Sequence, residues 1–550
     1  MSLDRGIGSW VTKQAFLNGD RIALVDGTGV RSSQTYTDFD NRTNQLARAL
    51  VELGVRRGDR VAMLLLNSIT FMEATFACAK LGAIMVPINV RLKGPEIAYI
   101  LADSGADVFF YHDLLAAEAR VALQEDGVRV RHCILDQITV SSPSSSSSPS
   151  PLSSGQSLDQ TTSQVPATAD EYNDINYESL LSSAPSQPLG MDVDPRDIHA
   201  IMYTSGTTGR PKGAMLTHAN AIANARNVVL IPPSISCADT TITVAPMFHI
   251  GGLGVHSLPF VYVGGKNVIF PTFEPQKFIQ AMADHKATVQ FLVPAMWAAV
   301  SRVPNFDSYD LSSLRLALSG GAPTPLPVIE FFQSHGVPFQ EGFGMTETAP
   351  TVAVLDAEHV VSKAGSIGRP LMHVEARIVD ENDRDVPVGA VGELALRGEN
   401  IFVGYWMMPE ATEEAFKGGW FHTGDLGRVD EEGFITLVDR LKDMIITGGE
   451  NVYPVEVEQV LVRHPDVMEV AVFGVPDERW GETVVAAVVL EQGSKASTED
   501  IIGYCRERMA HFKCPTQIVF MDELPRNATG KVLKTSLRRQ YSGIEQAVTR

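Results

Sequence analysis

Hydrophobic and polar positions follow two alternating rhythms in the first hundred residues. Residues 38–53 and 71–81 carry apolar side chains at helical spacing, and each stretch stops at a glycine, which predicts two helices. Residues 60–66 and 84–87 are short apolar runs suited to strands covered on both faces. Strands that alternate with helices predict an α/β fold with a largely parallel sheet.

This rhythm breaks abruptly in a low-complexity segment. Residues 141–154 hold ten serines, three prolines and one leucine, and the biased composition continues to about Thr168. Such a segment cannot bury enough apolar surface to offset the entropy lost on ordering. We therefore expect an insert over about 137–170 that forms a solvated surface loop.

The α/β rhythm resumes at Ile198 and changes again near residue 385. Glycine-bounded short strands over 385–440 (392–398, 427–430 and 433–439) predict a small β-rich subdomain. The uncharged stretch 240–265 contains prolines and glycines, so we interpret it as buried strands and loops rather than a membrane helix. The predicted elements of the tail are helices at 454–463 and 498–509 and strands at 469–475 and 483–490. We place one domain at 1–440 and a second at 441–550.

Composition adds limits rather than a function. The chain has 550 residues, 44% of them hydrophobic and 20% charged, with a formal net charge of −20 at pH 7. That charge argues against coating of nucleic acid or anionic membranes, although it allows anionic small molecules that need only a local cation. Five scattered cysteines are too few for a disulfide scaffold or zinc cluster, and no secretory signal is visible. A reducing, cytoplasmic location is predicted.

One loop has the composition of a phosphate-binding segment. Residues 203–215 read Tyr-Thr-Ser-Gly-Thr-Thr-Gly-Arg-Pro-Lys-Gly-Ala-Met and follow the apolar pair Ile201-Met202. Backbone N–H groups and hydroxyls of such a loop can surround phosphate oxygens, and Lys212 adds positive charge. The segment is not a Walker A loop, because Lys212 follows proline and no Gly-Lys-Ser/Thr occurs there.

Taken together, the motifs resemble those of the adenylate-forming enzymes: acyl-CoA synthetases, firefly luciferase and peptide-synthetase adenylation domains. The resemblance is strongest to bacterial fatty-acyl-CoA synthetases and covers nearly the whole chain outside 137–170. The matching segments, in order, are 203–215, Ala245-Pro-Met-Phe-His-Ile-Gly-Gly252, Ser319-Gly-Gly-Ala-Pro323, Gly342-Phe-Gly-Met-Thr-Glu-Thr348, Trp420-Phe-His-Thr-Gly-Asp425, Asp439-Arg-Leu-Lys-Asp443 and Pro525-Arg-Asn-Ala-Thr-Gly-Lys531.

The resemblance implies a fold and a reaction. The fold is a large N-terminal AMP-binding domain of layered α/β subdomains with a small β-rich subdomain, followed by a small mobile α+β C-terminal domain. The reaction joins a carboxylic acid, ATP and CoA to give acyl-CoA, AMP and diphosphate through an acyl-adenylate. Mg²⁺ is the implied cofactor. The implied partners are these small molecules and no nucleic acid; peripheral membrane contact, and a monomer or a homodimer, both stay open.

Residue roles are carried over on the matching motifs. Thr207 and Glu347 fall at the magnesium positions, where a hydroxyl and a carboxylate suit a hard cation. Asp425 falls where a carboxylate accepts from the ribose hydroxyls, and Arg440 supplies a charge near the ribose and phosphates; an ordinary structural ion pair is the alternative for these two. The implied ATP-binding set is Thr204, Ser205, Gly206, Thr207, Thr208, Gly209, Lys212, Gly320, Gly321, Ala322, Pro323, Gly342, Phe343, Gly344, Met345, Thr346, Asp425, Arg440 and Lys531.

The tail carries the remaining implied roles. Lys531 is the catalytic lysine, whose ammonium bridges the substrate carboxylate and the α-phosphate in the family. Lys442 falls at the hinge about which the tail domain rotates between the two half-reactions. Gly448 and Gly449 fall where pantetheine passes close to the backbone, although a plain turn is the competing interpretation.

The acyl pocket is the least specified part. Resemblance implies His249, Gly251, Trp297, Gly320 and Gly344 as its residues. His249 would orient the carboxylate or control the passage of CoA, and a satisfied core histidine is the alternative. Trp297 fits a pocket wall and a core position equally well. We expect a medium- or long-chain fatty acid, with an aryl acid of the benzoate or cinnamate type as the alternative.

Two other functions share the fold. An amino-acid adenylation module generally has an aspartate after the pocket phenylalanine, whereas His249 follows Phe248 here. A luciferase-like oxygenase is disfavoured only by the closer likeness to ligases. A catalytically dead nucleotide-binding protein would have lost Lys531, Glu347 or Asp425, and all three are present.

Overall fold

The computed structural model describes residues 5–137, 174–204, 211–440, 443–447, 450–477, 480–526 and 532–541, without the side chains of residues 440, 450 and 451. The chain divides into two compact units. Unit 1 comprises residues 1–219, 236–253 and 260–273, and unit 2 comprises residues 220–235, 254–259 and 274–550.

A seven-stranded sheet forms the centre of unit 1. Its strands from β6 to β8 run parallel, and β8 turns back into the antiparallel edge strand β9. In order across the sheet the strands are β7 (Ile175–Asn176), β6 (His132–Asp136), β5 (Val108–His112), β3 (Arg60–Leu64), β4 (Ile84–Pro87), β8 (Ile198–Thr204) and β9 (Lys212–Thr217). The parallel sheet confirms the α/β prediction.

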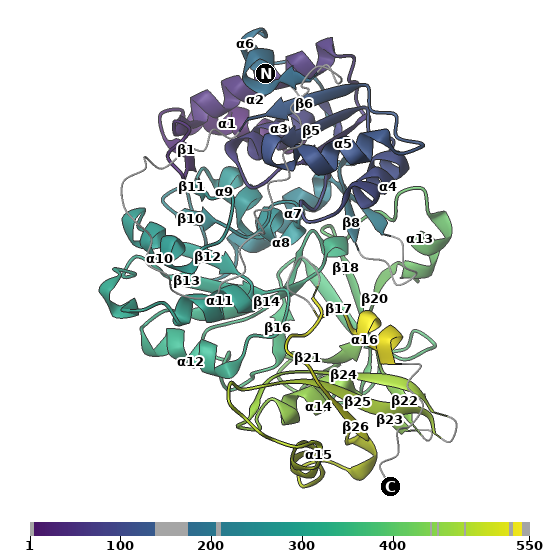
Figure 1. The fold of residues 1–550 in the computed structure, drawn as a ribbon. Helices are drawn as coiled ribbons and strands as arrows, with labels where there is room; N and C mark the ends of the chain where they lie inside the picture. Colours follow the sequence, from purple (N-terminus) through teal and green to yellow (C-terminus); the bar gives the residue numbers. More distant parts are fainter. Residues whose placement is uncertain are drawn as a thin grey trace. The chain divides into compact units, whose positions relative to one another are not determined.

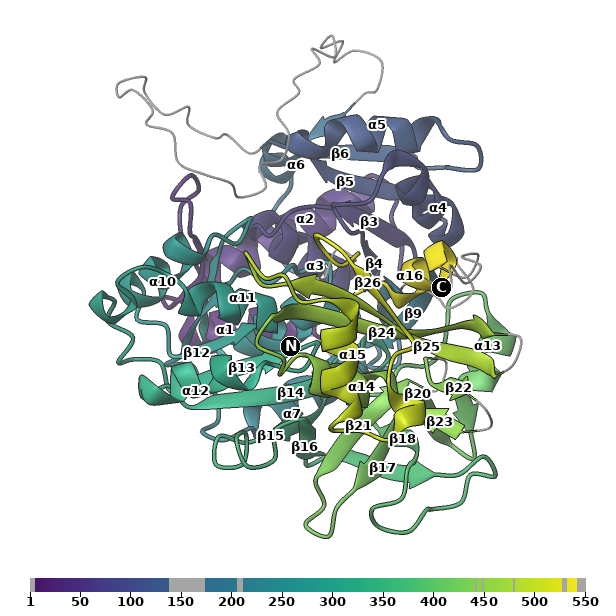
Figure 2. The same ribbon diagram turned by 60° about the horizontal axis from the view of Figure 1, so that its bottom comes forward.

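Helices cover both faces of this sheet. Figures 1 and 2 show α2 and α3 on one side of β5 and β6, and α4 and α5 on the other. Helix α2 begins two residues before the predicted start, because Thr35 and Asp38 form a capping box at its N-terminus. The helices are α1 (Gly8–Asn18), α2 (Tyr36–Glu52), α3 (Ile69–Leu81), α4 (Gly94–Ser104), η1 (Asp113–Leu115), α5 (Ala116–Gln124) and α6 (Tyr177–Ser182).

A second, four-stranded sheet of unit 1 corrects one prediction. It has the order β10 (Thr240–Thr243), β11 (Lys266–Ile269), β1 (Ile22–Asp26) and β2 (Gln34–Thr35). The stretch 240–265 contains strand β10, but its second half is helical rather than strand and loop: α8 (Ile250–Gly252), the π-helix η2 (Leu253–Ser257) and α9 (Leu258–Val263). Pro259 directly follows the π-helix, inside a helical run that continues without a break from Ile250 to Val263.

Unit 2 contains a ten-stranded mixed sheet. Strands β12, β13 and β14 are parallel, and every later pairing in the sheet is antiparallel. The strands are β12 (Val289–Leu292), β13 (Leu316–Gly320), β14 (Phe339–Gly344), β15 (Thr351–Leu355), β16 (Ser366–Pro370), β21 (Ile435–Arg440), β20 (Trp420–Val429), β18 (Gly392–Gly398) and β17 (Val374–Val379), with β19 (Phe416–Lys417) beside β20.

The antiparallel part of this sheet holds the predicted β-rich segment. The separate short strand predicted at 427–430 is not found. Gly427-Arg-Val is instead the end of the ten-residue strand β20. The helices of this part of the chain are α7 (His218–Val229), α10 (Pro275–Asp284), α11 (Pro294–Ser301), η3 (Phe306–Ser308), α12 (Leu326–Ser334), η4 (Thr346–Thr348) and α13 (Pro409–Ala415).

Residues 445–541 build a third layered structure around their own five-stranded sheet. Alternate residues of β25 face opposite sides: Val484 and Val488 pack with α14 and α15, whereas Val485 and Val489 pack against α16. The elements are β22 (Ile445–Thr447), β23 (Glu450–Val452), α14 (Pro454–Leu461), β24 (Val467–Asp477), β25 (Gly481–Leu490), α15 (Thr498–Arg506), η5 (His511–Lys513), β26 (Gln517–Phe520) and α16 (Lys534–Tyr541). The boundary at 440/441 stays a prediction.

In the part of the chain that the structure describes, no helix combines the length and the apolar character that crossing a membrane requires.

Candidate active site

The ends of the predicted phosphate loop are fixed by a β-hairpin in unit 1. Strands β8 and β9 pair Thr204 directly with Lys212, and the Thr204 hydroxyl donates to the Lys212 carbonyl at 3.4 Å. The described flanks of this segment are both strands, β8 before it and β9 after it. Ser205, Gly206, Thr207, Thr208 and Gly209 lie outside the described residues.

His249 is a neutral, half-buried histidine at the start of α8. Burial, with a smaller contribution from the positive charge of Arg91, lowers the pKa of His249 to about 4. Its Nε2 is buried without a hydrogen-bond partner in the structure, and its ring lies 4.5 Å from that of Phe248. A buried ring nitrogen without a partner is not a satisfied core histidine, which favours the pocket interpretation. Gly251, also assigned to the pocket, lies in the middle residue of α8.

Two predicted nucleotide motifs meet at one edge of the unit 2 sheet. The carboxyl ends of the parallel strands β13 and β14 bring Gly320 level with Gly342 in the ladder. Residues 321–323 then form an exposed turn with Gly321 at φ +91°, a conformation suited to glycine. A side chain at Gly344 would place its Cβ 1.8 Å from the Pro350 carbonyl oxygen. Ligands bind at carboxyl ends of parallel strands, so this edge is a credible nucleotide site.

Glu341 was missed by the sequence reasoning and supports that turn. It lies on β14 directly before Gly342, and its Oε1 accepts a hydrogen bond from the Thr324 backbone N–H at 2.7 Å. The Thr324 hydroxyl in turn donates to Ser319 Oγ at 2.7 Å. Burial raises the pKa of Glu341, although the Thr324 contacts oppose the shift. A carboxylic residue in an otherwise apolar strand was the available signal.

Glu347 lies on the single turn η4 and is only 7% exposed. Its Oε1 accepts a hydrogen bond from the Tyr405 phenol at 3.0 Å, and its backbone carbonyl accepts from the Phe402 N–H at 2.8 Å. A buried carboxylate oxygen is a donor type that Mg²⁺ prefers, so this residue fits the implied cation. Thr207, the other predicted metal residue, lies outside the described residues.

Asp425 and Arg440 are opposite each other on the neighbouring strands β20 and β21. Asp425 is 4% exposed, and Gly424 before it adopts φ +71°. The Thr423 hydroxyl accepts from the Asp425 N–H at 3.0 Å, which fixes the turn. Strand register thus places the predicted ribose carboxylate and the predicted arginine side by side along the backbone; the Arg440 side chain lies outside the description.

The tail assignments mostly fall beyond the described residues. Lys442, Gly448, Gly449 and Lys531 lie outside them. Of the described cations near Lys531, Lys534 forms an ion pair with Glu458 at 2.8 Å, and Arg538 pairs with Asp443 at 2.9 Å.

Trp297 belongs to the core rather than to a pocket wall. Its side chain is 0% exposed, and its indole N–H donates to the Leu318 carbonyl at 3.2 Å. The rings of Phe332 and Phe339 lie 4.8 and 5.4 Å away in edge-on packing. Its polar atom is thus satisfied by β13 and its ring packs against α12 and β14, which is the environment of a core residue.

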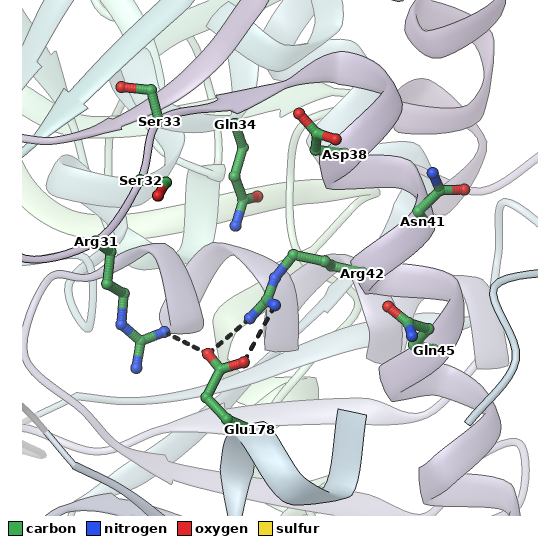
Figure 3. Close-up of a pocket in the computed structure, with 9 residues that line it drawn as sticks. All are labelled: Arg31, Ser32, Ser33, Gln34, Asp38, Asn41, Arg42, Gln45 and Glu178. Carbon is green, nitrogen blue, oxygen red and sulfur yellow. Dashed lines mark hydrogen bonds and ion pairs between the residues drawn. The ribbon is translucent and has the colours of Figure 1, made fainter. Parts of the chain in front are cut away.

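The structure also contains a polar cavity of about 560 Å³ in unit 1. Figure 3 shows Arg31 and Arg42 converging there on Glu178, whose Oε1 lies 3.3 and 2.8 Å from them. Each arginine also contacts a carboxylate beneath, Asp136 and Glu73 respectively, so the charges are already matched. None of the predicted site residues lines this cavity, and we interpret it as a structural charge cluster.

The fold and these motifs define an adenylate-forming enzyme, and comparison with known families agrees. Residues 11–406 match the AMP-binding enzyme family and residues 456–531 match the AMP-binding enzyme C-terminal domain, so the chain belongs to this family.

Similar proteins include two named ligases and a solved structure. A feruloyl-CoA synthase of Amycolatopsis sp. is 38% identical over 538 residues, covering 98% of this chain and 99% of that protein. The long-chain-fatty-acid–CoA ligase FadD13 of Mycobacterium tuberculosis is 35% identical over 536 residues, covering 97% and 98%. The crystal structure of ATP-bound MatB from Rhodopseudomonas palustris superposes with a TM-score of 0.84 at 29% identity, covering 99% and 100%.

Proposed function

We propose that the protein is an ATP-dependent acid–CoA ligase. In the first half-reaction the substrate carboxylate attacks the α-phosphorus of ATP, giving an acyl-adenylate and diphosphate. In the second, the CoA thiol gives up its proton and attacks the acyl carbon, and AMP leaves. The sequence contains no evident dedicated base for the thiol, which must react as thiolate or lose its proton during attack.

One observation carries this proposal. The register of β13 against β14 brings the turn after Gly320 beside the segment that leads through Gly342 to Glu347. Adenylation needs a place for the adenine and a buried carboxylate for a phosphate-bound cation, and we assign these roles to the exposed turn 321–323 and to Glu347. The similarity to ATP-bound MatB over nearly the whole chain supports ATP as the nucleotide.

Joining two anions requires offsetting their repulsion and stabilising charge on phosphorus and diphosphate. We assign Asp425 to the ribose hydroxyls, Lys212 to phosphate, and Lys531 to the bridge between carboxylate and α-phosphate. Glu347, with Thr207, would hold Mg²⁺, which when bound supplies Lewis-acid charge neutralisation at the phosphates.

For the second half-reaction we assign Lys442 to a hinge and Gly448 and Gly449 to the pantetheine path. Thr447 pairs with Glu450 across β22 and β23 on either side of the two glycines, and this pairing fits the alternative of a plain turn as well as it fits the pantetheine path. A hinge residue has only to tolerate two backbone conformations.

The test separates the two halves. Lys531→Ala is expected to abolish diphosphate release from acid and ATP while leaving thiolysis of supplied acyl-AMP by CoA largely intact. Lys534→Ala is the matched control, because its ammonium pairs with Glu458 and is expected to matter to neither step. Equal loss of both half-reactions in Lys531→Ala would overturn the assignment.

The acid is proposed to be a medium- or long-chain fatty acid, supported by the similarity to FadD13. The similarity to a feruloyl-CoA synthase favours an aryl acid as the second candidate. One methylene in an apolar pocket changes selectivity by only about 1–3 kcal/mol, so a profile is needed rather than a single substrate. Diphosphate release across C6–C18 fatty acids, benzoate and hydroxycinnamates decides between them by the highest kcat/KM.

A cytoplasmic location is proposed on chemical grounds. All five cysteines are free thiols in the structure, which fits a reducing compartment where ATP and CoA are available. Cell fractionation with a thiol-labelling assay tests this.

A further inference from the structure

Tyr405 has no role among the site residues assigned above, yet its side chain contacts one of them, Glu347. Its phenol oxygen donates a hydrogen bond to Glu347 Oε1 at 3.0 Å, joining residues 58 positions apart in the chain. Glu347 lies on a three-residue turn, which by itself gives a carboxylate little fixed orientation. The phenol therefore supplies a constraint that the local backbone cannot.

The segment that carries Tyr405 is itself tightly held. The Tyr405 N–H donates to the Thr412 hydroxyl at 2.9 Å, and its ring packs edge-on against Phe402 at 4.9 Å. Phe402, 2% exposed, donates its N–H to the Glu347 carbonyl. At Gly404, with φ +136°, a Cβ would lie 2.5 Å from the Thr412 methyl. The segment 402–405 thus donates hydrogen bonds to both the backbone carbonyl and the carboxylate of Glu347.

The chemical nature of the Tyr405 donor matters as much as the geometry of its hydrogen bond to Glu347. A phenol is a neutral donor, so it orients the carboxylate without offsetting its negative charge, whereas an arginine or lysine at this distance would offset it.

We propose that Tyr405 is a positioning residue that holds the Glu347 carboxylate in the orientation that binds the divalent cation. This rests on the proposed function, which assigns Glu347 to that cation. Groups that orient metal ligands in this way change metal affinity by about 10- to 100-fold when removed. Because the phenol is a single neutral donor, we expect the lower end.

The test measures metal binding apart from turnover. Mn²⁺ is titrated by electron paramagnetic resonance into the full-length protein with a non-hydrolysable ATP analogue. Tyr405→Phe, which keeps the ring packing, is expected to weaken Mn²⁺ binding about 10-fold. It should raise the Mg²⁺ concentration for half-maximal diphosphate release equally, with kcat at saturating Mg²⁺ and metal-free AMP binding within twofold of wild type.

Two further variants keep the outcomes distinct. Tyr111→Phe removes a matched phenol–carboxylate contact, to Asp174 at 2.7 Å in unit 1, and is expected to leave Mn²⁺ affinity unchanged. Glu347→Gln is expected to abolish Mn²⁺ binding. If Tyr405→Phe binds Mn²⁺ like wild type while Glu347→Gln does not bind it, the role of Tyr405 is overturned and that of Glu347 stands. If both variants bind Mn²⁺ like wild type, the assignment of Glu347 is overturned, and with it part of the proposed function. Should Tyr405→Phe not fold, Thr412→Val loosens the same loop and is expected to weaken Mn²⁺ binding two- to threefold, and no change there would overturn the proposal.

Discussion

Two buried carboxyl groups, one in each unit, are held in opposite ways. Asp136 in unit 1 is 1% exposed; burial alone would raise its pKa, but the hydrogen bond with His112 and the charge of Arg31 lower it overall. Glu341 in unit 2 is 8% exposed and bonded to the backbone N–H of Thr324, and burial raises its pKa. Cationic partners thus hold the Asp136 carboxylate, whereas a neutral donor orients the Glu341 carboxyl group.

The type of hydrogen-bond donor distinguishes carboxyl groups that stabilise the fold from carboxyl groups that can bind a ligand. In the Arg31–Arg42 cluster every carboxylate faces a guanidinium, so its charge is already used within the protein. Glu347 accepts from a phenol and Glu341 from a backbone amide, and both are neutral donors that orient a carboxyl group without supplying an opposite charge. A region that binds a cation or polar ligand needs the second arrangement.

The largest expected effect is the loss of catalysis on changing Glu347. Glu347→Gln keeps the shape and the acceptor for Tyr405 but removes the charge for a cation. Diphosphate–ATP exchange is expected to fall at least about 100-fold, because Lewis-acid stabilisation of a phosphoryl group is worth several kcal/mol. The melting temperature should stay within about 2 °C, which corresponds to roughly 1 kcal/mol for a unit of this size. A large stability loss would place Glu347 with the structural carboxylates instead.

The second effect is on stability in unit 1. Arg42→Met leaves Glu73, 0% exposed, without its guanidinium, and breaking such a pair costs about 3 kcal/mol. The urea midpoint should fall accordingly while kcat/KM at 20 °C stays within twofold. Arg196→Met, at an 88% exposed arginine paired with Asp194, serves as control and should leave the midpoint unchanged. If Arg42→Met reduced kcat/KM more than twofold while the urea midpoint stayed near that of wild type, the cavity in Figure 3 would need a functional explanation.

A third prediction concerns acid. His218 accepts from the Ile7 N–H through Nδ1 at 3.2 Å, and burial lowers the pKa of His218 to about 3, with Arg57 contributing. The unfolded chain, with a histidine pKa near 6.5, binds more protons below that pH, so stability is lost as pH falls from 6.5 towards 3. His218→Asn keeps the acceptor without the titration. Its urea midpoint should fall less than that of wild type between pH 7.5 and 5; parallel curves would refute this.

The fourth effect has the opposite sign. Because the pKa of Glu341 is raised above 4.5, the folded state binds the extra proton and Glu341 loses its favourable contribution as pH rises through the raised value. Glu341→Gln keeps an acceptor for Thr324 and should gain melting temperature relative to wild type from pH 5 to pH 8. An unchanged difference across that range would show that Glu341 carries no proton at the lower pH.

The smallest effect is expected from the serine-rich insert. Deleting 141–165 leaves thirteen residues between Asp136 and Ile175, and a parallel crossover needs about a dozen. Turnover should stay within a few-fold of wild type and the melting temperature within about 2 °C. A collapse of either would mean that the segment is structural rather than a solvated loop.

Periodicity predicted the regular parts of the fold well. The helix over 71–81 and the strand at 84–87 lie within a residue or two of α3 and β4, because each ends at a glycine or proline. The helical half of 240–265 could not be read from pattern, since glycines and prolines in a wholly buried segment leave no polar face to mark a period. There the tertiary environment decides.

The site was predictable only where a contiguous motif carries it. Glu347 and Asp425 stand inside such strings, whereas Glu341 and Tyr405 act through Thr324 and through a carboxylate 58 residues away. Contacts between distant segments leave no local pattern in a single sequence. Trp297 shows the converse, because its motif gave no means of telling a core ring from a pocket wall.

The hairpin of β8 and β9 has a consequence for how this protein can be altered. Thr204 and Lys212 are the last rungs of a ladder whose earlier rungs, Ile201 with Met215 and Met202 with Ala214, are set into the sheet. An added residue between Thr204 and Lys212 cannot be absorbed by sliding, because a one-residue slip turns every side chain of the strand to the other face. The register of the two strands therefore fixes where the intervening segment begins and ends, so an added residue has to be accommodated between Thr204 and Lys212 rather than by a shift of β8 against β9.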